Sequence, residues 1–599
     1  MEMDFFLAEF NIEKRTVEEF TIPECDSLSL SGARICWKAS SPMVSMQRLS
    51  EWTVFLWGAP QYREESKTSQ ELTREIAVSL SQGDRLHSNL IKLEGFFAIL
   101  AWNEKNSELL FATDPIGMMK VYYREFQGRV VISSHAHLIA RRFDDFTVSA
   151  QGLSLLFSLK GIPAPYTVFQ RVSVLKPAEL VSVSDAGRSS EEYWAILEHV
   201  KPFQGSFEDA QGELQDLLAK NLRKIAAGSH EPIGLSMSGG VDSALIAALL
   251  VQEKIPVQGL TVGYKPLTRN DETQAASETA QQIGFPIEVF KVSDEDISSI
   301  LDCAIKSFPE PLGDATVLPQ LLMTLSAKGK VAAIIDGTGA DNIFGGMQKF
   351  TAERYAMQYL RIPRFLRVNL IRPVLNMFNS SRKSSFTDQV RKMQKFAYGV
   401  EMPARQQKVY WSRFMDQKAV EGIIAQALSP DGRLADEILM GIRDEVPVGF
   451  DDFYTSSYAS IRGTMPTHAA QKLVTLQYAS GSFYHTPFMT PDLIEFALSL
   501  PVSFKLSARE TKVVLRRTYS KILPTECTNL KKATFSPPIG RWLMGVLRTE
   551  FMDLLKGNEF FTTDTIQKMI SEQDAGRRDW QWELWLVYIF LKWFKEVSR

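Results

Sequence analysis

The segment from Ile233 to Leu250 constrains this 599-residue chain most strongly. Its apolar start is typical of a buried strand, and its apolar end, Ala244–Leu250, is typical of a buried helix. Between them stands Ser238-Gly239-Gly240-Val241-Asp242-Ser243. Because glycine lets backbone N–H groups approach an oxyanion and a helix N-terminus favours negative charge, this pattern predicts a phosphate-binding loop. A glycine-rich turn capped by Ser and Asp, without a ligand, is the alternative.

Asp242 lies inside this ring of predicted phosphate donors. A carboxylate beside bound phosphate is stable when both meet a cation, so the sequence predicts Mg²⁺ bridging Asp242 and phosphate oxygens. The loop is not of the Walker type, because GxxxxGK[ST] occurs nowhere in the chain.

Composition excludes several classes of protein. A net charge of -3, with 45% hydrophobic and 23% charged residues, is typical of a globular protein and gives no field suited to nucleic acid. Four scattered cysteines predict neither a disulfide framework nor a zinc site, so a reducing cytoplasm is expected. The acidic N-terminus predicts no export signal, and Leu584–Leu591 is too short to span a membrane, so no transmembrane segment is expected.

The pattern of the chain changes near residue 200. Before it, short alternating runs predict strands; after it, Phe207–Ala227 predicts a helix, followed by alternating strands and helices to Phe344 and nearly all helix beyond Gln348. We therefore expect an α/β protein with domains at 1–200 and 201–599, the second carrying a basic helical insertion at 350–440. The predicted strands of the first domain include Leu93–Trp102, Leu109–Thr113, Lys120–Tyr123 and Arg129–Ser134.

The segment from Arg354 to Lys395 holds ten basic residues and one acid, Asp388. A solvated helical face, with the interleaved Phe and Leu residues in the core, is one interpretation. A docking surface for an acidic partner or anionic lipid is the other.

The phosphate loop resembles that of N-type ATP pyrophosphatases, and further motifs, in the family's order, resemble the asparagine synthetase superfamily. In the first domain these are Leu93–Trp102, Asp114–Gly117, Val121–Tyr123, Gly161–Pro163, Thr167–Phe169, Leu175–Pro177 and Tyr193-Trp194. In the second they are Asp271-Glu272, Glu310-Pro311 with Asp314, Asp336–Gly346, Thr486–Phe488, Lys512 with Leu515-Arg516, and Lys531–Phe535 leading to Pro538 and Trp542.

The resemblance implies an N-terminal Ntn-type, glutaminase-like αββα sandwich and a C-terminal PP-loop ATP pyrophosphatase α/β domain with helical additions. It implies that ATP is cleaved to pyrophosphate and an acyl-adenylate, with Asp242 and Asp341 as magnesium ligands and Lys532 stabilising developing charge. An Asx turn at Asp341 and a surface lysine at Lys532 are the alternatives. The implied ATP-binding residues are Met237, Ser238, Gly239, Gly240, Asp242, Ser243, Val262 and Gly337.

The chain also departs from that family. Glutamine-hydrolysing members need an N-terminal cysteine, whereas position 2 is Glu2 and the first cysteine is Cys25, so a degenerate amino domain is expected. Thr338 and Asn342 replace the usual glutamates of asparagine synthetases. Met489-Thr490 replaces the usual Leu-Asp, and Thr534 replaces a glycine. These changes predict that free aspartate is not the substrate.

The chain most resembles lasso peptide cyclases, which form a macrolactam. The resemblance rests on the intact phosphate loop beside a degenerate amino domain, the turn Gly337-Thr338-Gly339-Ala340-Asp341-Asn342 and the long basic helical insertion. The resemblance implies that an Asp or Glu side chain of a precursor peptide is adenylated and captured by the peptide's own amine. A leader-peptide protease and a leader-binding partner are the implied partners. Asparagine synthetase fed by ammonia and β-lactam synthetase remain the enzyme alternatives, and a peptide-presenting scaffold is the non-enzyme alternative. The seven histidines, including His135 and His137, show no metal-ligand spacing and are predicted to be structural.

Overall fold

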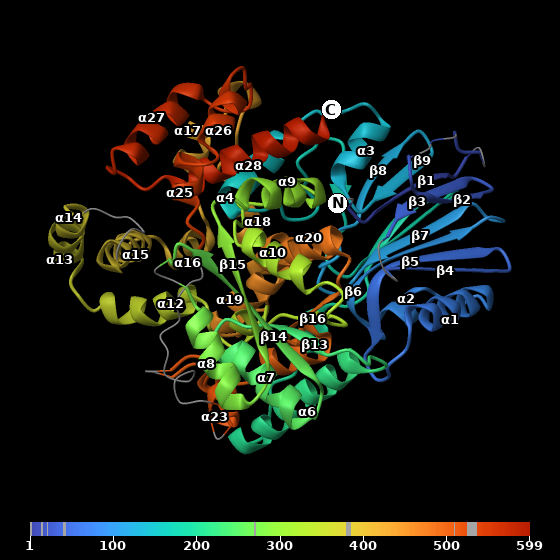
Figure 1. Cartoon of the computed structure of the whole chain (residues 1–599), viewed down its shortest axis with the longest axis horizontal. Coiled ribbons are helices and arrows are strands. Elements are labelled where there is room, and N and C mark those ends of the chain that lie inside the picture. Colours follow the sequence, from blue (N-terminus) through green and yellow to red (C-terminus); the bar gives the residue numbers. More distant parts are fainter. Residues whose placement is uncertain are drawn as a thin grey trace.

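The computed structural model describes residues 3–13, 16–18, 20, 22–39, 43–268, 271–378, 385–507, 510–520, 522–523 and 536–599. Lys532 and Thr534, two residues singled out above, lie outside this range. Figure 1 shows an amino-terminal part built on two layered sheets beside a larger part built on a third sheet, with helices around it.

Two six-stranded sheets form the amino-terminal part. They pack face to face: the rings of Phe6 and Phe55 lie 5.7 Å apart, and those of Phe10 and Trp102 lie 5.5 Å apart. One sheet has the order β10(Ser173–Val174), β8(Tyr122–Phe126), β9(Arg129–Ser133), β1(Phe5–Asn11), β3(Ala33–Lys38), β2(Asp26–Leu30). The other has the order β12(Gly187–Glu192), β11(Glu179–Ser184), β7(Glu108–Thr113), β6(Leu93–Asn103), β5(Trp52–Tyr62), β4(Val44–Leu49).

Helices cover both sheets. α1(Ser69–Ser81) packs on β4 and β5, and α3(Ala136–Arg142) packs on β8 and β9. This arrangement confirms the predicted αββα sandwich. The remaining helices here are α2(His87–Leu90), α4(Ala150–Leu159) and α5(Ile196–His199).

One strand begins later than predicted. β8 starts at Tyr122 rather than Lys120, because the preceding chain turns around a buried carboxylate. Asp114 accepts hydrogen bonds from the backbone N–H groups of Ile116, Met118 and Met119, at 3.1, 2.9 and 2.7 Å.

The second part contains a parallel five-stranded sheet in the order β15(Ile287–Ser293), β14(Val257–Lys265), β13(Ile233–Ser236), β16(Ile334–Ile335), β17(Tyr484–His485). The predicted α/β class is therefore confirmed. The apolar run Val331–Ile335 supplies only the two residues of β16. The helix α6(Phe207–Ala226) precedes this sheet. The helices that follow its strands β13, β14, β15 and β16 are α7(Val241–Gln252), α8(Thr273–Ile283), α9(Ile297–Ser307), α10(Val317–Ala327) and α11(Ala340–Ile343).

The helix α6 opens the second part. It begins where predicted because Ser206 and Asp209 form a capping box, and its buried face repeats through Ala210, Leu214, Leu218 and Leu222. β12 ends at Glu192 and α6 begins at Phe207. The exact division at 200 stays a prediction.

The remaining chain is mostly helical. β17 is the exception to the expected helical pattern beyond Gln348, because Tyr484–His485 joins the open edge of β16. Among the described residues, no helix combines the length and apolarity that crossing a membrane requires. The elements are α12(Gln348–Tyr359), α13(Arg364–Leu366), η1(Arg367–Ile371), α14(Arg372–Asn376), α15(Ser385–Gly399), α16(Ala404–Ser412), α17(Gln417–Ile423), η2(Gln426–Leu428), α18(Leu434–Asp444), α19(Asp452–Ala459), η3(Ser460–Ala469), α20(Ala470–Ser480), η4(Pro487–Met489), α21(Pro491–Ser499), α22(Val502–Lys505), α23(Val513–Thr518), α25(Ile539–Met544), α26(Arg548–Leu555), α27(Thr563–Asp574) and α28(Gln581–Val597).

The expectation that the Phe and Leu residues of the basic segment are core is wrong for most of them. Leu360, Phe365, Leu366, Leu370, Phe378 and Phe386 are exposed. The reason is the orientation of the helix that contains α13, η1 and α14: it buries Arg367 toward the protein and turns its apolar face outward. Arg382 and Lys383 of this segment lie outside the described residues.

Candidate active site

The phosphate loop joins β13 to α7. Met237 extends the strand, since its N–H donates to the Leu260 carbonyl at 2.8 Å. Gly239 then has φ +51°, and a Cβ there would lie 2.7 Å from the Cβ of Ala275. Glycine is therefore required by both the backbone and the space. α7 begins at Val241, so the first N–H groups of a twelve-residue helix lie at the end of a parallel strand.

The two serines of the loop face one another. Their hydroxyl oxygens lie 3.4 Å apart, the Ser238 N–H donates to Ser243 Oγ at 3.3 Å, and Ser243 Oγ donates to the Gly240 carbonyl at 3.2 Å. The loop thus presents hydroxyls and amide donors together, as an oxyanion of a phosphate requires.

Asp341 lies on the neighbouring turn, which follows β16. Thr338 donates to Asp336 Oδ1 through its N–H at 2.9 Å and its hydroxyl at 2.5 Å, and Gly339 adopts φ +107°. β16 pairs with β13, so both turns leave the sheet at its carboxyl edge, where open α/β sheets bind ligands. Asp341 and Asp242 are thereby brought together.

A buried lysine joins these two carboxylates. Lys512 Nζ lies 2.5 Å from Asp242 Oδ2 and 2.6 Å from Asp341 Oδ1, and its side chain is 4% exposed. Burial lowers the pKa of Lys512, while Asp242 acts to raise it. Lys512 itself has φ 55°, a strained conformation for a residue with a Cβ. The motif containing Lys512 was visible in the sequence, but no spacing signal indicated this contact.

The donors fit a magnesium ion. Asp242 Oδ1 is buried and has no hydrogen-bond partner among the described residues. A Cβ on Gly346 would overlap Asp341 Oδ1 and Lys512 Cε, so a glycine there keeps room for both side chains. The described chain contains no cluster of three or more His, Cys, Asp or Glu residues. Two carboxylates completed by phosphate oxygens and water are the kind of ligand set that Mg²⁺ takes.

The other predicted ATP-binding residues lie around this centre. A Cβ on Gly337 would lie 3.4 Å from the Cβ of Asp242, so Gly337 directly adjoins the loop. Val262 lies further along β14 from Leu260, the residue paired with Ser236, and it is nearly buried. The structure thus groups Met237 to Ser243 with Gly337 and Asp341, and it places Val262 on the adjacent strand.

Three uncharged side chains, those of Thr338, Asn342 and Met489, lie at this turn. The Asn342 side-chain N–H donates to Ser460 Oγ on the π-helix η3 at 2.8 Å. A Cβ on Gly339 would overlap the Sδ of Met489, so this thioether packs on the turn. Thr338 is held by Asp336. Hydroxyl, amide and thioether groups therefore lie together at the turn that carries Asp341.

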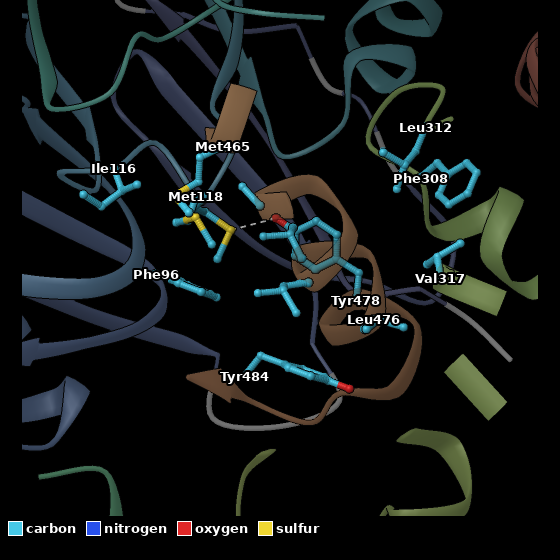
Figure 2. Packing of buried hydrophobic residues seen from close by; sticks show 14 of the residues in the cluster. Phe96, Ile116, Met118, Phe308, Leu312, Val317, Met465, Leu476, Tyr478 and Tyr484 are labelled. Carbon is cyan, nitrogen blue, oxygen red and sulfur yellow. Dashed lines mark hydrogen bonds between the residues drawn. The ribbon is translucent and has the colours of Figure 1, made fainter. Parts of the chain in front are cut away.

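The amino-terminal sandwich contacts the second part through buried apolar side chains. Figure 2 shows Phe96, Ile116 and Met118 facing Met465 and Tyr478. The Tyr478 hydroxyl donates to Met119 Sδ at 2.9 Å, and its backbone carbonyl accepts the Asp4 N–H at 3.1 Å, just before β1.

The described cysteines are not activated nucleophiles. Burial raises the pKa of Cys25, Cys36 and Cys303. A reactive cysteine instead needs a lowered pKa.

His135 and His137 pack within the core. Their rings lie 5.4 Å apart, and burial lowers the pKa of His135 to about 3 and that of His137 well below its ordinary value. Both are therefore neutral, packed side chains.

The comparisons with known proteins agree with this geometry. Residues 213–595 match the asparagine synthase family model, and residues 74–194 match a glutamine amidotransferase domain. Asparagine synthetase [glutamine-hydrolyzing] 1 of Bacillus subtilis is 22% identical over 505 residues, which cover 84% of this chain and 77% of that protein. Amidase chyE of Penicillium rubens is 21% identical over 554 residues, covering 84% and 79%.

The family match covers more than half of the chain and includes the phosphate loop, the Asp341 turn and Lys512. This chain therefore belongs to the asparagine synthetase family and is an ATP-dependent amide ligase.

Proposed function

We propose that the chain closes a macrolactam in a precursor peptide, as a lasso peptide cyclase does. The observation that carries the proposal is the set of uncharged side chains at the Asp341 turn, Thr338, Asn342 and Met489, which we take as the acyl side of the site. Free aspartate carries an α-ammonium and an α-carboxylate that need charged partners when they are desolvated. An Asp or Glu within a peptide has amides in their place, which hydroxyl and amide groups can bind.

The source of the amine also supports this proposal. The described cysteines have raised pKa values, and the part of the contact between the amino-terminal sheets and the second part that Figure 2 draws is packed with apolar side chains. These features support an amine supplied by the peptide itself. Holding both reacting groups in one pocket gives effective molarities of roughly 10⁵ M or more when the geometry is right.

The chemistry has two steps. The peptide carboxylate attacks the α-phosphorus of ATP, so that an acyl-adenylate forms and pyrophosphate leaves. The peptide amine then attacks the acyl carbon, the amide bond forms, and AMP leaves with the carboxyl oxygen while the amine loses a proton.

Specific residues have roles in these steps. Ser238, Gly239, Gly240 and Ser243 orient the phosphates, and Lys512 balances charge beside them. When bound by Asp242 and Asp341, Mg²⁺ would supply positive charge against the phosphate oxygens.

Asparagine synthesis from free ammonia is the second candidate, because curated relatives of this chain bear asparagine synthetase names. The macrolactam proposal further implies a precursor peptide, a leader-peptide protease and a leader-binding partner. The scaffold alternative predicts no ATP turnover.

The test compares two substrate mixtures with purified protein, ATP and Mg²⁺. One contains source-cell peptides with a leader-removing protease, and the other contains aspartate with ammonium. AMP together with a peptide one water lighter supports the proposal, whereas AMP with free asparagine replaces it by the second candidate. Asp242→Asn and Asp341→Asn are expected to abolish AMP release, and turnover by either variant would remove that residue from the metal site.

A further inference from the structure

The most unusual surface of the molecule is the basic lobe, which we define as residues 355–378 and 385–398. Its helices α13, α14 and α15 project from the body in Figure 1, away from the three sheets. The described chain exposes twenty-three large apolar side chains, and twelve of them lie in this lobe. Such a concentration marks an interaction surface rather than scattered surface residues.

One helix organises the apolar part of the lobe. α13, η1 and α14 follow one another without a break from Arg364 to Asn376. Leu366, Leu370, Val374 and Met377 are spaced by four, four and three residues, so they share one face. All four are exposed, and Met377 reaches 83%. Phe365, at 71% exposed, stands beside this stripe.

The outward direction of the stripe is fixed by the opposite side of the helix. Arg367 is buried, donates to Glu401 Oε1 at 2.8 Å, and donates to the carbonyls of Leu360 and Ile362 at 2.9 and 3.0 Å. Because these bonds hold Arg367 inward, rotating the helix to bury the stripe would break all three. The apolar face is therefore part of the folded structure.

Positive charge surrounds the stripe. Between residues 361 and 401 the described chain has seven basic residues and two acids, although the whole protein has a net charge of -3. Both acids are already paired: Asp388 contacts Arg391 and Lys392, and Glu401 contacts Arg364 and Arg367. Arg361 and Arg364 are exposed at the start of the helix. The lobe thus presents a net positive surface.

We propose that the basic lobe docks on an anionic lipid bilayer. An exposed stripe of Leu, Val, Met and Phe on a projecting helix, flanked by arginine, suits the boundary between headgroups and acyl chains. Arginine near an anionic leaflet adds attraction that salt screens. α12 begins at Gln348, two residues after Gly346, so docking would hold the active-site turn near the membrane surface.

The first experiment is co-sedimentation of the full-length protein with vesicles. Phosphatidylcholine vesicles containing phosphatidylglycerol are expected to bind it at low salt, and pure phosphatidylcholine vesicles and high salt are expected to weaken binding. The partition coefficient of the variant Leu370→Ser/Met377→Ser onto vesicles should be about tenfold or more lower than that of the wild type. The reason is that burying each of these apolar side chains in the bilayer removes apolar area from water. Val448→Ser is the matched control, because Val448 is fully exposed elsewhere. AMP formation should be unchanged in both variants.

Two further variants keep the test decisive. Arg361→Gln/Arg364→Gln should reduce binding to anionic vesicles several-fold, whereas Lys556→Gln, an exposed lysine outside the lobe, should not. Phe365→Trp should add tryptophan fluorescence to that of the wild type. The emission maximum of this added fluorescence should shift to the blue when anionic vesicles are added. Absence of wild-type binding, equal binding by the stripe variant, or an unshifted added emission from the Phe365→Trp variant would overturn the proposal. A lobe that instead binds an acidic protein and ignores vesicles would also overturn it.

Discussion

At the scale of single residues, Lys512 decides how the two carboxylates of the site coexist. Its Nζ lies within 2.6 Å of both Asp242 and Asp341. Without that ammonium, two partly buried carboxylates would repel one another in a medium where charge is poorly screened. Lys512 therefore belongs to the ATP site as much as the phosphate loop does.

We predict that Lys512→Met lowers ATP-dependent AMP formation by about a hundredfold or more, the usual scale for a lost electrostatic contact at a reacting centre. The measurement is AMP release under saturating ATP and substrate. Lys328→Met, which changes an exposed lysine of the same domain, should retain normal release. A Lys512→Met enzyme of normal rate would exclude Lys512 from the site.

His135 gives a prediction about pH. Burial lowers the pKa of His135 to about 3, whereas the pKa of a histidine in the unfolded chain is about 6.5. Below about pH 6.5 the unfolded chain binds a proton that the folded chain does not, so the stability that this histidine contributes is complete above about pH 6.5 and falls as pH drops toward 3. The expected loss is about 1.4 kcal/mol per pH unit for this histidine.

Urea unfolding at pH 7, 6 and 5 measures this loss. His135→Asn should reduce the slope of the free energy of unfolding against pH by the amount that one bound proton contributes, whatever the effect of the substitution on stability at pH 7. His230→Asn, at an exposed histidine, should leave the slope unchanged. Identical slopes for wild type and His135→Asn would contradict the assignment of a buried neutral imidazole.

At the scale of elements, Gly346 allows the turn after β16 to pack closely against the start of α23. We predict that Gly346→Ala displaces Asp341 and Lys512, because its Cβ would overlap atoms of both. AMP formation should fall by at least about tenfold, corresponding to the loss of about 1.4 kcal/mol of transition-state stabilisation.

A matched glycine tests whether the effect is local. Gly212 lies within α6, and a Cβ there meets no atom within 4 Å. Gly212→Ala should therefore raise stability by up to about 1 kcal/mol and leave AMP formation unchanged. Comparable activity loss in both variants would show that Gly346 has no special role.

The elements also show how far the sequence predicts this molecule. The strand, phosphate loop and helix from Ile233 to Leu250 could be predicted because the apolar pattern and the position of the glycines agree locally. β17 could not, since Tyr484–His485 is a strand only through its pairing with β16. The contact of Lys512 with Asp242 joins residues 270 positions apart, which no local pattern encodes.

The exposed stripe of the basic lobe is the clearest prediction failure. Apolar residues at helical spacing ordinarily face a core, and the sequence of Leu366, Leu370 and Val374 has that spacing. The bonds of Arg367 to Glu401 and to the Leu360 carbonyl hold the opposite side of this helix toward the protein. Lys532 remains a prediction, because it lies outside the described residues.

At the scale of the whole molecule, two sheets with a glutaminase-type architecture pack against an ATP-cleaving domain through a contact that includes buried apolar side chains. The described part of that contact includes Tyr478 beside Trp57, whose rings lie 6.1 Å apart. The phosphate loop and the Asp341 turn lie at the carboxyl edge of the parallel sheet in the second part. The reaction proposed for this edge joins a peptide's own carboxylate and amine.

Mass spectrometry of the peptide product, combined with an AMP assay, tests this reaction. Purified protein is incubated with source-cell peptides, a leader-removing protease, ATP and Mg²⁺. The proposed reaction predicts a peptide lighter by the mass of one water. This peptide should form only when ATP is present and in proportion to the AMP released. AMP accompanied by free asparagine from aspartate and ammonium, with every peptide mass unchanged, would contradict it.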